Sequence, residues 1–407
     1  MKQIIHLLLL AGLLPLHIFL CARADVLDNW TTNQITTNSF GMHHVVYGNG
    51  IFVAVGEKGD SGGFYTSVDG QNWKLQYSEP NSWGVTLNYS GGRFAGVCVG
   101  LGSGVVDVSA DGTNWTTTLF SMNGLPAFAP KAIVYGNSLY VAVGSTNNIA
   151  CIFTSPDGIT WTPRKASTTP GGQIYSVAYG ASKFVAVGAD GLEYTSATGT
   201  GTWGKTSFPG TGLISFANGL FISPLNNKTN VISLDGVNWS LKPTGLTNQL
   251  GAVTYGNGVF MAQCGLPATP IYFASSTDGT NWFQYSRPLP NRWGFYTGNG
   301  PYDVSLVSDG TRLIAVGSDN YISPPYGNGF IFDSGLLVGT RMTNSPPRSV
   351  VVSGLVGRNY QVQSKDSLSA DNNWRTNVTV QLTNTPIIWT DTSATNAARF
   401  YRTVLLP

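Results

Sequence analysis

Glu57 and Glu79 are the residues whose type best suits acid–base chemistry. Two carboxylates that flank a glycosidic bond can act as a general acid and as a base or nucleophile. We expect these two residues to come from adjacent units of a repeated structure, which would allow such a pair. Glutamate is scarce in this chain, where Glu193 is the only other one. We therefore assign no catalytic residue and keep Glu57 and Glu79 as candidates.

A second set of residues has the composition of a carbohydrate-binding surface. The segments 80–84 (Pro-Asn-Ser-Trp-Gly) and 290–294 (Pro-Asn-Arg-Trp-Gly) are near copies. Exposed aromatic rings stack on sugar rings, and neighbouring polar groups orient hydroxyls. The alternative is that Trp83 and Trp293 pack between repeat units at the start of a strand. The candidate ligand-binding residues are Trp83, Arg287, Arg292, Trp293, Tyr296, Tyr321 and Tyr326.

Metal and cofactor chemistry has little support in the sequence. His43 and His44 are adjacent on a predicted strand, so we expect their side chains on opposite faces, where they cannot chelate one ion together. No acidic spacing matches a calcium loop, and no phosphate-binding glycine loop precedes a predicted helix. We expect no metal and no cofactor.

The elements that must position these residues belong to a repeat of about forty residues, a period typical of four-stranded propeller blades. Its first half contains Asn-Gly hairpin turns such as Tyr47-Gly-Asn-Gly. Its second half reads Ser-x-Asp-Gly-x-x-Trp, with a degenerate copy in which Thr198 replaces the aspartate. The Asp and Trp positions of the five complete copies are Asp69 and Trp73, Asp111 and Trp115, Asp157 and Trp161, Asp235 and Trp239, and Asp278 and Trp282.

The Ser-x-Asp-Gly-x-x-Trp motif resembles the Asp-box of sialidase-type β-propellers, shortened by one residue between Asp and Gly. The resemblance covers residues 28–335 and implies the fold. Ser and Asp can hydrogen-bond their own turn while Trp packs between layers, so we expect the motif residues to be structural. Sialidases also carry an N-terminal Arg-Ile-Pro motif within an arginine trio. This chain lacks that motif, which favours a non-catalytic protein over a glycoside hydrolase of sialidase-like fold.

The repeats predict an all-β chain with a seven-bladed propeller of four-stranded antiparallel blades, followed by a small β-sandwich. Six complete units lie at about 43–78, 83–120, 131–165, 174–208, 212–243 and 250–288. A seventh begins at Tyr302 and lacks a Trp, which the segment near Trp30 can supply. We therefore expect the N-terminal strand to close the last blade; the alternative is completion by residues 336–338.

Loop lengths separate the two faces of this predicted propeller. The hairpin and Asp-box turns share one face and are short. The other face collects connections that we expect to be long and irregular, and such loops on a rigid scaffold often carry function. The segments assigned to this face include 57–63, 77–83, 122–130, 287–296 and 319–326.

The predicted domains are 1–24 as a signal peptide, 25–340 as the propeller, 341–348 as a linker and 349–407 as the sandwich. The last segment resembles C-terminal modules of secreted bacterial proteins, which implies an accessory role in a bacterial, extracellular setting. Cys98, Cys151 and Cys264 remain after signal removal, and we interpret them as buried free thiols.

Composition excludes two classes of partner. Charged residues are 10% and the net charge is +2, too small for nucleic-acid binding or electrostatic membrane attachment. We expect a secreted or cell-surface monomer, not inserted in a membrane after signal cleavage, that binds extracellular glycan or a secreted protein without catalysis. The alternatives are a glycoside hydrolase of sialidase-like fold and a structural surface or matrix protein.

Overall fold

The described part of the chain consists of β-strands, turns and short irregular segments, without a helix. The computed structural model describes residues 31–34, 41–58, 61–80, 82–100, 104–120, 128–165, 172–188, 191–226, 228–256, 259–265, 272–285, 305–309, 312–318, 329–336, 339–342, 349–354, 357–365, 374–383, 387–392 and 400–406. Within these residues there is no helix that could span a membrane.

Six consecutive groups of strands form four-stranded antiparallel sheets, named sheets 1 to 6 in chain order. Sheets 1 to 3 contain β2 (Gly41–Gly48), β3 (Ile51–Lys58), β4 (Ser61–Ser67) and β5 (Lys74–Pro80); β6 (Ser82–Ser90), β7 (Arg93–Gly100), β8 (Gly104–Ser109) and β9 (Thr116–Leu119); and β10 (Ala129–Gly136), β11 (Leu139–Thr146), β12 (Ile149–Ser155) and β13 (Thr162–Lys165). Sheets 4 to 6 contain β14 (Ile174–Gly180), β15 (Lys183–Gly188), β16 (Leu192–Ser196) and β17 (Gly204–Ser207); β18 (Ser215–Ala217), β19 (Leu220–Asn226), β20 (Thr229–Ser233) and β21 (Ser240–Pro243); and β22 (Leu250–Gly256), β23 (Val259–Cys264), β24 (Tyr272–Ser276) and β25 (Phe283–Gln284).

A further four-stranded sheet, sheet 7, joins the two ends of this region. It contains β26 (Ser305–Ser308), β27 (Arg312–Ser318), β28 (Gly329–Leu336) and the N-terminal strand β1 (Thr31–Gln34). β1 pairs antiparallel with β28, with Thr31 opposite Asp333. The outer position of this sheet is thus occupied by a strand from the other end of the chain.

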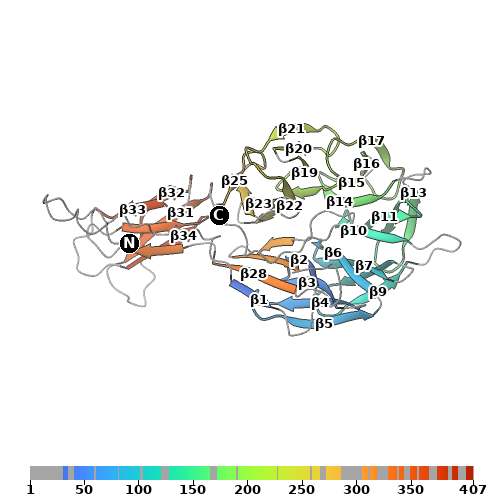
Figure 1. The fold of residues 1–407 in the computed structure, drawn as a ribbon, viewed down its shortest axis with the longest axis horizontal. Coiled ribbons are helices and arrows are strands. Elements are labelled where there is room, and N and C mark those ends of the chain that lie inside the picture. The colour runs from blue at the N-terminus through green and yellow to red at the C-terminus, as the bar shows by residue number, and fades with distance from the viewer. Residues whose placement is uncertain are drawn as a thin grey trace, which may run out of the picture.

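The seven described sheets stand around a common centre, as Figure 1 shows, with the first strand of each sheet innermost. Each innermost strand contacts the innermost strands of both neighbouring sheets, from β2 through β26 and back to β2. The architecture is a β-propeller made of four-stranded antiparallel blades.

Asn and Gly residues set the turns between first and second strands. Asn49 and Gly50 have φ values of 49° and 79°, and Asn137 and Ser138 have 48° and 56°. Two successive residues with positive φ give the type I′ geometry that matches the twist of paired strands, and Asn and Gly adopt it at low cost. The Asn-Gly signal of the sequence therefore marks real hairpins.

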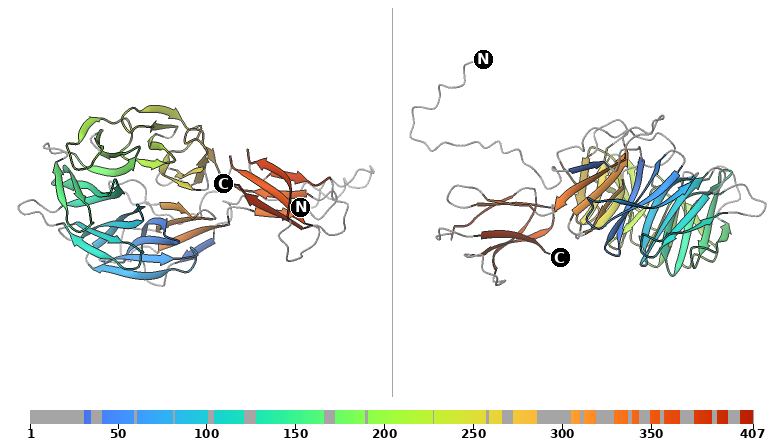
Figure 2. Two further views of the ribbon diagram at one scale, coloured as in Figure 1. Left: turned by 180° about the vertical axis from the view of Figure 1, so that it is seen from behind. Right: turned by 90° about the horizontal axis from the view of Figure 1, so that it is seen from below.

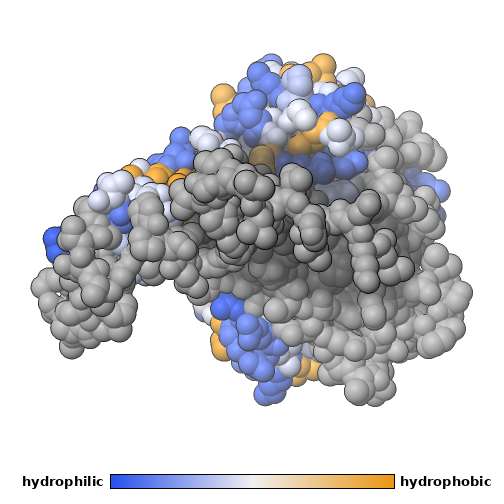
Figure 3. All heavy atoms as spheres, turned by 60° about the vertical axis from the view of Figure 1, so that its left-hand side comes forward, coloured by the Kyte–Doolittle hydropathy of each residue, from blue (hydrophilic) through white to orange (hydrophobic). Residues whose placement is uncertain are grey.

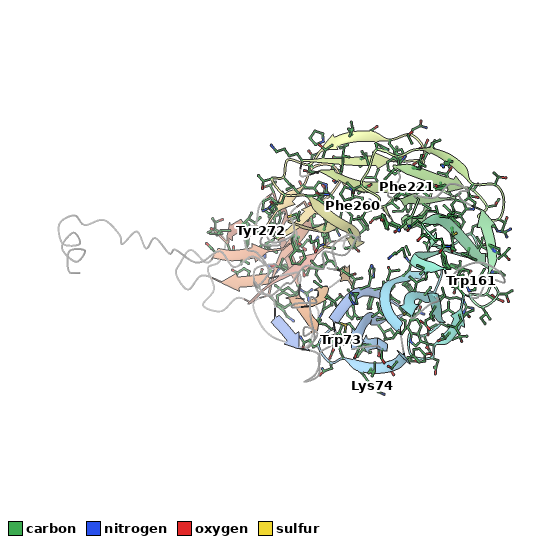
Figure 4. The ribbon with its side chains drawn as sticks, turned by 45° about the vertical axis from the view of Figure 1, so that its right-hand side comes forward. Trp73, Lys74, Trp161, Phe221, Phe260 and Tyr272 are labelled. Carbon is green, nitrogen blue, oxygen red and sulfur yellow. The ribbon has the colours of Figure 1, made fainter. Side chains whose placement is uncertain are left out.

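Hydrophobic cores lie between neighbouring sheets. Trp73 and Phe52 of sheet 1 pack with residues of sheet 7, whereas Phe64 of sheet 1 packs with sheet 2. Phe221 and Phe260 belong to the cores on either side of sheet 5, and Figure 4 shows both between the ribbons. Alternate residues of a strand thus pack against the sheets on its two sides, because successive side chains of a strand point to opposite faces.

A tyrosine–glycine contact links one inner hairpin to the next. A Cβ atom on Gly136 would lie 2.1 Å from the ring of Tyr179 in the following sheet. The same relation holds between Gly48 and Tyr89 at 2.4 Å. The glycine of each pair must therefore lack a side chain, because the aromatic ring of the next sheet fills its place.

Two three-stranded sheets follow the propeller. One contains β29 (Gly339–Met342), β30 (Ser349–Ser353) and β33 (Ile387–Thr390); the other contains β31 (Asn359–Lys365), β32 (Arg375–Gln381) and β34 (Phe400–Leu405). Val350 of the first sheet and Tyr360 of the second share one buried core. Figure 2 shows these sheets beside the propeller. Arg341 and Met342, assigned to a linker from the sequence, belong to β29 and pair with β30.

The three cysteines of the described residues are free, with Cys98 and Cys264 buried and Cys151 half-buried. Described residues visible in Figure 3 are mostly hydrophilic, with scattered hydrophobic residues. Among all described residues, the most exposed large apolar side chains are Val68 and Leu234, each in the second position of a Ser-x-Asp-Gly turn.

Candidate binding face

Most of the predicted ligand-binding residues fall outside the described residues. These are Arg287, Arg292, Trp293, Tyr296, Tyr321 and Tyr326. Trp83 is the exception, because its backbone belongs to β6 and pairs opposite Val99. It lies in the innermost strand of sheet 2, the location that the packing alternative assumed.

Two of the segments predicted as long loops are strands. In the segment 57–63, β3 continues to Lys58 and β4 starts at Ser61. In the segment 77–83, β5 continues to Pro80 and β6 starts at Ser82. The glycines and polar residues of these segments suggested loops, but very short turns join strands that extend through them.

The prediction that Glu57 and Glu79 come from adjacent repeat units is wrong. Both residues lie in sheet 1, where Glu57 pairs opposite Gly62 and Gly62 pairs opposite Glu79. The two glutamates therefore occupy one cross-strand row, separated by β4. Two strand spacings place their backbones roughly 10 Å apart.

Connections between second and third strands are short in five sheets and long in two. In sheets 1 to 5 they comprise residues 59–60, 101–103, 147–148, 189–191 and 227–228. The corresponding connections in sheets 6 and 7 comprise 265–271 and 319–328, and 285–304 joins these two sheets. All three attach at the end opposite the Ser-x-Asp-Gly turns, because strands alternate in direction. Connections between second and third strands are therefore long only in sheets 6 and 7, and the end of these two sheets is called the long-loop sector below. The connections 120–128 and 166–173, which join other sheets, also lie at this end.

Five of the seven described innermost strands have a β-bulge near the same end. The register shifts between Met42 and His44 in β2, and between Ile174 and Ser176 in β14. Strands β6, β10 and β22 carry similar shifts. An extra residue interrupts the alternation of side chains and redirects them locally.

The bulge at His43 interrupts the regular alternation on which the expectation for His43 and His44 rests. The pKa of His44 is lowered to about 4, mainly by burial and to a smaller extent by the positive charge of His43. Nδ1 of His44 has no hydrogen-bond partner among the described residues. The described residues hold no group of three or more metal-binding side chains.

In two other sheets, serine occupies the position equivalent to His44. Its hydroxyl makes hydrogen bonds to the backbone of the neighbouring repeat unit. Ser305 Oγ accepts a hydrogen bond from Val45 N at 3.0 Å and donates one to Val45 O at 3.2 Å. Ser176 makes the same pair of bonds with Ile214, at 3.3 and 3.2 Å. This position therefore serves contacts between inner strands.

The Ser-x-Asp-Gly turns form the opposite end of the sheets and use their carboxylates locally. Asp157 Oδ1 accepts hydrogen bonds from Ile159 N at 2.8 Å and Thr160 N at 2.7 Å. These backbone donors lower the pKa of Asp157 to about 2. Trp161 closes the turn by donating from Nε1 to Gly158 O at 3.1 Å.

The other complete copies repeat this geometry around Asp69, Asp111, Asp235 and Asp278. In each, the serine Oγ accepts from the glycine N–H, as Ser67 does from Gly70 at 2.9 Å. Trp73, Trp115 and Trp282 donate to the glycine carbonyl of their own turn. The carboxylates are thus saturated by their own turns, an arrangement unsuited to acid–base catalysis.

Two fully buried carboxylates escaped the sequence reasoning. Asp107 accepts hydrogen bonds from Thr117 Oγ1 at 2.6 Å and from Cys98 Sγ at 3.5 Å. Glu193 accepts from Thr206 Oγ1 at 2.7 Å and from Trp239 Nε1 at 2.6 Å. A charged residue within an apolar strand is the only sequence signal for such a group. Both lie in sheet interiors and are engaged by protein donors.

Solved structures with a similar fold include proteins of diverse roles. A structure described as "YCF48 bound to D1 peptide" has a TM-score of 0.53 and 16% identity, covering 78% of this chain and 97% of that one. A streptogramin B lyase structure has a TM-score of 0.56 and 12% identity, with coverages of 75% and 99%. A chain in a structure of the mitotic checkpoint complex has a TM-score of 0.52 and 9% identity, covering 74% of this chain and 90% of that one. No protein-family model and no curated protein matches the chain. Identities this low show the propeller fold alone.

Proposed function

We propose that this chain is an exported, non-catalytic binding protein that recognises extracellular glycan through the long-loop sector of its propeller. The supporting observation is the concentration of the connections 265–271, 285–304 and 319–328 at one end of sheets 6 and 7. Sheets 1 to 5 have only two or three residues between their second and third strands, and none of their connections to the next sheet is as long as 285–304. Long loops on a regular scaffold often carry ligand-binding residues.

The composition of these connections favours a sugar ligand. They contain the predicted residues Arg287, Arg292, Trp293, Tyr296, Tyr321 and Tyr326. Aromatic rings beside guanidinium and amide groups provide stacking surfaces and hydroxyl partners. Export rests on residues 1–24, which have the n-region, apolar stretch and Ala-Arg-Ala cleavage pattern of a signal peptide.

The finer architecture belongs to the same proposal. The seven described sheets would be the blades of one ring, with β1 closing the last blade through its pairing with β28. The Ser-x-Asp-Gly turns would be shortened Asp-boxes, and the two three-stranded sheets with their common core would form a β-sandwich. In this arrangement the Asp-boxes hold the scaffold and leave the opposite end for ligand.

A secreted protein is the second candidate ligand. The similar propeller YCF48 is described as bound to a peptide, which shows that this architecture can accept one. Glycan remains our first choice because of the aromatic and arginine content of the long-loop sector.

Glycoside hydrolysis is retained as an alternative because of one specific relation. Glu57 and Glu79 flank Gly62 in one row, and Gly62 contributes no side chain between them. Their backbones lie roughly 10 Å apart, and inverting glycosidases hold their two carboxyl groups about 6.5–9.5 Å apart. Hydrolysis of aryl glycosides that disappears in Glu57→Gln would establish this alternative and refute the non-catalytic proposal.

The direct test is a glycan array with the full chain and a variant combining Trp83→Ala, Trp293→Ala and Tyr326→Ala. We expect the native chain to be retained on particular glycans and the triple variant to lose that retention. The matched control combines Val68→Ala, Ile159→Ala and Leu234→Ala, which truncate exposed apolar residues at the opposite end.

Equal glycan binding by the triple variant and the native chain would refute the location. A native chain that binds no glycan but captures a secreted protein would favour the second candidate. A chain that binds neither would favour the structural surface or matrix alternative.

A further inference from the structure

The outer face of the β32–β31–β34 sheet carries an ordered polar network with an aromatic ring at its edge. Arg402 Nε donates to Gln363 Oε1 at 2.8 Å, and the Arg402 guanidinium lies 4.5 Å from the centre of the Trp374 ring. Gln363 Nε2 donates to Gln361 Oε1 at 3.0 Å and to Thr376 Oγ1 at 3.3 Å. Arg402 and Thr376 are exposed, so this network faces solvent.

The network fixes the guanidinium of Arg402 in one plane. The Trp374 indole packs against the guanidinium, and Gln363 Oε1 accepts the hydrogen bond from Nε. Neither Nη group of Arg402 donates a hydrogen bond to a described residue. A planar fork of donors that is already held in place loses little conformational freedom when a carboxylate arrives. Arg402 is therefore prepared for a two-point hydrogen bond with an anionic group.

Charge at this sheet favours an acidic ligand. The strands β31, β32 and β34 contain Lys365, Arg375 and Arg402 and no aspartate or glutamate. Arg402 lies in the polar row of the outer face. Lys365 is buried, and Arg375 pairs opposite the buried Ser364. Among the described strand residues, a carboxylate approaching this face therefore meets the charge of Arg402 and no acidic side chain.

The remaining groups of the face suit hydroxyl-rich partners. The register places Arg402, Gln363 and Thr376 in one cross-strand row, and Gln361 with Thr379 in the next. Amides and hydroxyls both donate and accept, so neighbouring rows offer partners for the hydroxyls of successive sugars.

We propose that this face binds an acidic polysaccharide, with Arg402 taking a uronate carboxylate and Gln361 and Gln363 contacting hydroxyls. A peptide that binds a sheet usually adds a strand to its edge through main-chain hydrogen bonds. The prepared groups lie instead on the face, which favours a flat polymer of sugars over an acidic peptide. The site is separate from the long-loop sector and does not depend on the function proposed for it.

The test measures binding of the full chain to polygalacturonate by affinity electrophoresis and titration calorimetry. We expect Arg402→Gln to weaken binding roughly tenfold or more, because a charge-assisted bidentate contact is lost. Trp374→Leu should also weaken it, since the guanidinium loses its support. The matched control, Arg375→Gln, removes the same charge from β32 and should bind within about twofold of the native chain. Thermal unfolding of each variant checks that the module remains folded.

Three results would overturn the proposal. The first is a native chain that does not bind polygalacturonate, and the second is equal binding by Arg402→Gln. The third is equal binding of fully methyl-esterified polygalacturonate or of poly-glutamate, which would point to a neutral glycan or to an acidic protein. The Trp83, Trp293 and Tyr326 variant should keep its polygalacturonate binding, so failure at either face is recognised separately.

Discussion

Trp239 donates a 2.6 Å hydrogen bond from its indole to Glu193, a buried carboxylate in the preceding sheet. In four other Ser-x-Asp-Gly turns the indole donates to the glycine carbonyl of its own turn. Trp239 thus converts a local contact into one between sheets 4 and 5. Thr206 Oγ1 donates to the second carboxylate oxygen at 2.7 Å.

Replacing Glu193 by leucine should destabilise the propeller by about 1–3 kcal/mol, because the indole N–H of the half-buried Trp239 and the hydroxyl of the exposed Thr206 lose their acceptor. Glu193→Gln should cost less, since its amide oxygen can accept from Trp239 while its NH₂ group donates to the Thr206 hydroxyl. Chemical denaturation of both variants at neutral pH measures the difference. Equal losses in the two variants would show that shape, and not hydrogen bonding, sets the cost.

The charge of Glu193 also predicts a pH dependence. Burial raises its pKa, partly opposed by the hydrogen bonds from Thr206 and Trp239. The folded state therefore binds more protons than the unfolded state, and this contribution to stability falls as pH rises from the ordinary glutamate value through the raised one. The stability of Glu193→Gln relative to the native chain should increase over that window. A difference that stays constant with pH would contradict this.

Short-range patterns made the scaffold predictable from the sequence. The Ser-x-Asp-Gly-x-x-Trp motif marks turns whose hydrogen bonds are local, so Asp69 and Trp73 form the same contacts as Asp111 and Trp115. The Asn-Gly signal likewise depends on adjacent residues only. The all-β propeller with four-stranded blades follows from repeating these local units.

The relations that the sequence missed depend on register and on distant partners. A bulge leaves no mark in the run Met-His-His-Val, so the register shift between Met42 and His44 could not be foreseen. Glu57 and Glu79 come together in one sheet only through their shared pairing with Gly62. The six ligand candidates between Arg287 and Tyr326 lie outside the described residues and remain predictions.

The contact between Gly136 and Tyr179 should be sensitive to a single methyl group. Gly136→Ala places a Cβ atom 2.1 Å from the tyrosine ring and should cost about 1–3 kcal/mol of unfolding free energy through overpacking. In a Tyr179→Ala background the same substitution should cost much less, which a double-mutant cycle measures.

Gly92→Ala is the control for backbone strain at the hairpins. Gly92 has a φ of 79° and no atom within 4 Å of an added Cβ, so its cost arises from conformation alone. A cost for Gly136→Ala that persists without the Tyr179 ring would contradict the steric account.

The aspartate of each turn should contribute through its backbone hydrogen bonds. Asp157→Ala removes the acceptor for Ile159 N and Thr160 N and should cost about 1–2 kcal/mol. Asp157→Asn keeps an acceptor and should cost less. Because the pKa of Asp157 is lowered to about 2, its contribution is present above the ordinary value and is lost as pH falls toward 2. Denaturation curves between pH 5 and 2 should show a smaller acid dependence in Asp157→Asn.

The degenerate turn offers the converse experiment. Thr198 Oγ1 accepts from Thr200 N and Gly201 N at 3.3 Å, longer than the corresponding bonds of Asp157. Thr198→Asp should shorten and strengthen both bonds and stabilise the chain by roughly 0.5–1 kcal/mol. A loss of stability would show that the extra residue before Trp203 prevents the usual turn geometry.

His44 should make the propeller sensitive to mild acid. Its pKa is lowered to about 4 by burial and by the charge of His43, so between pH 4 and about 6.5 the unfolded chain binds more protons than the folded chain. Stability should therefore rise with pH over this range and fall on acidification.

His44→Ser removes the titrating group and introduces the residue found at the equivalent positions Ser176 and Ser305, where Oγ bridges the adjacent strand. We expect the difference between the denaturant midpoints of unfolding at pH 4.5 and pH 7 to be smaller for this variant than for the native chain. His43→Ser should also reduce the acid dependence, because it removes the neighbouring charge. An unchanged pH profile in both variants would show that the acid sensitivity arises elsewhere.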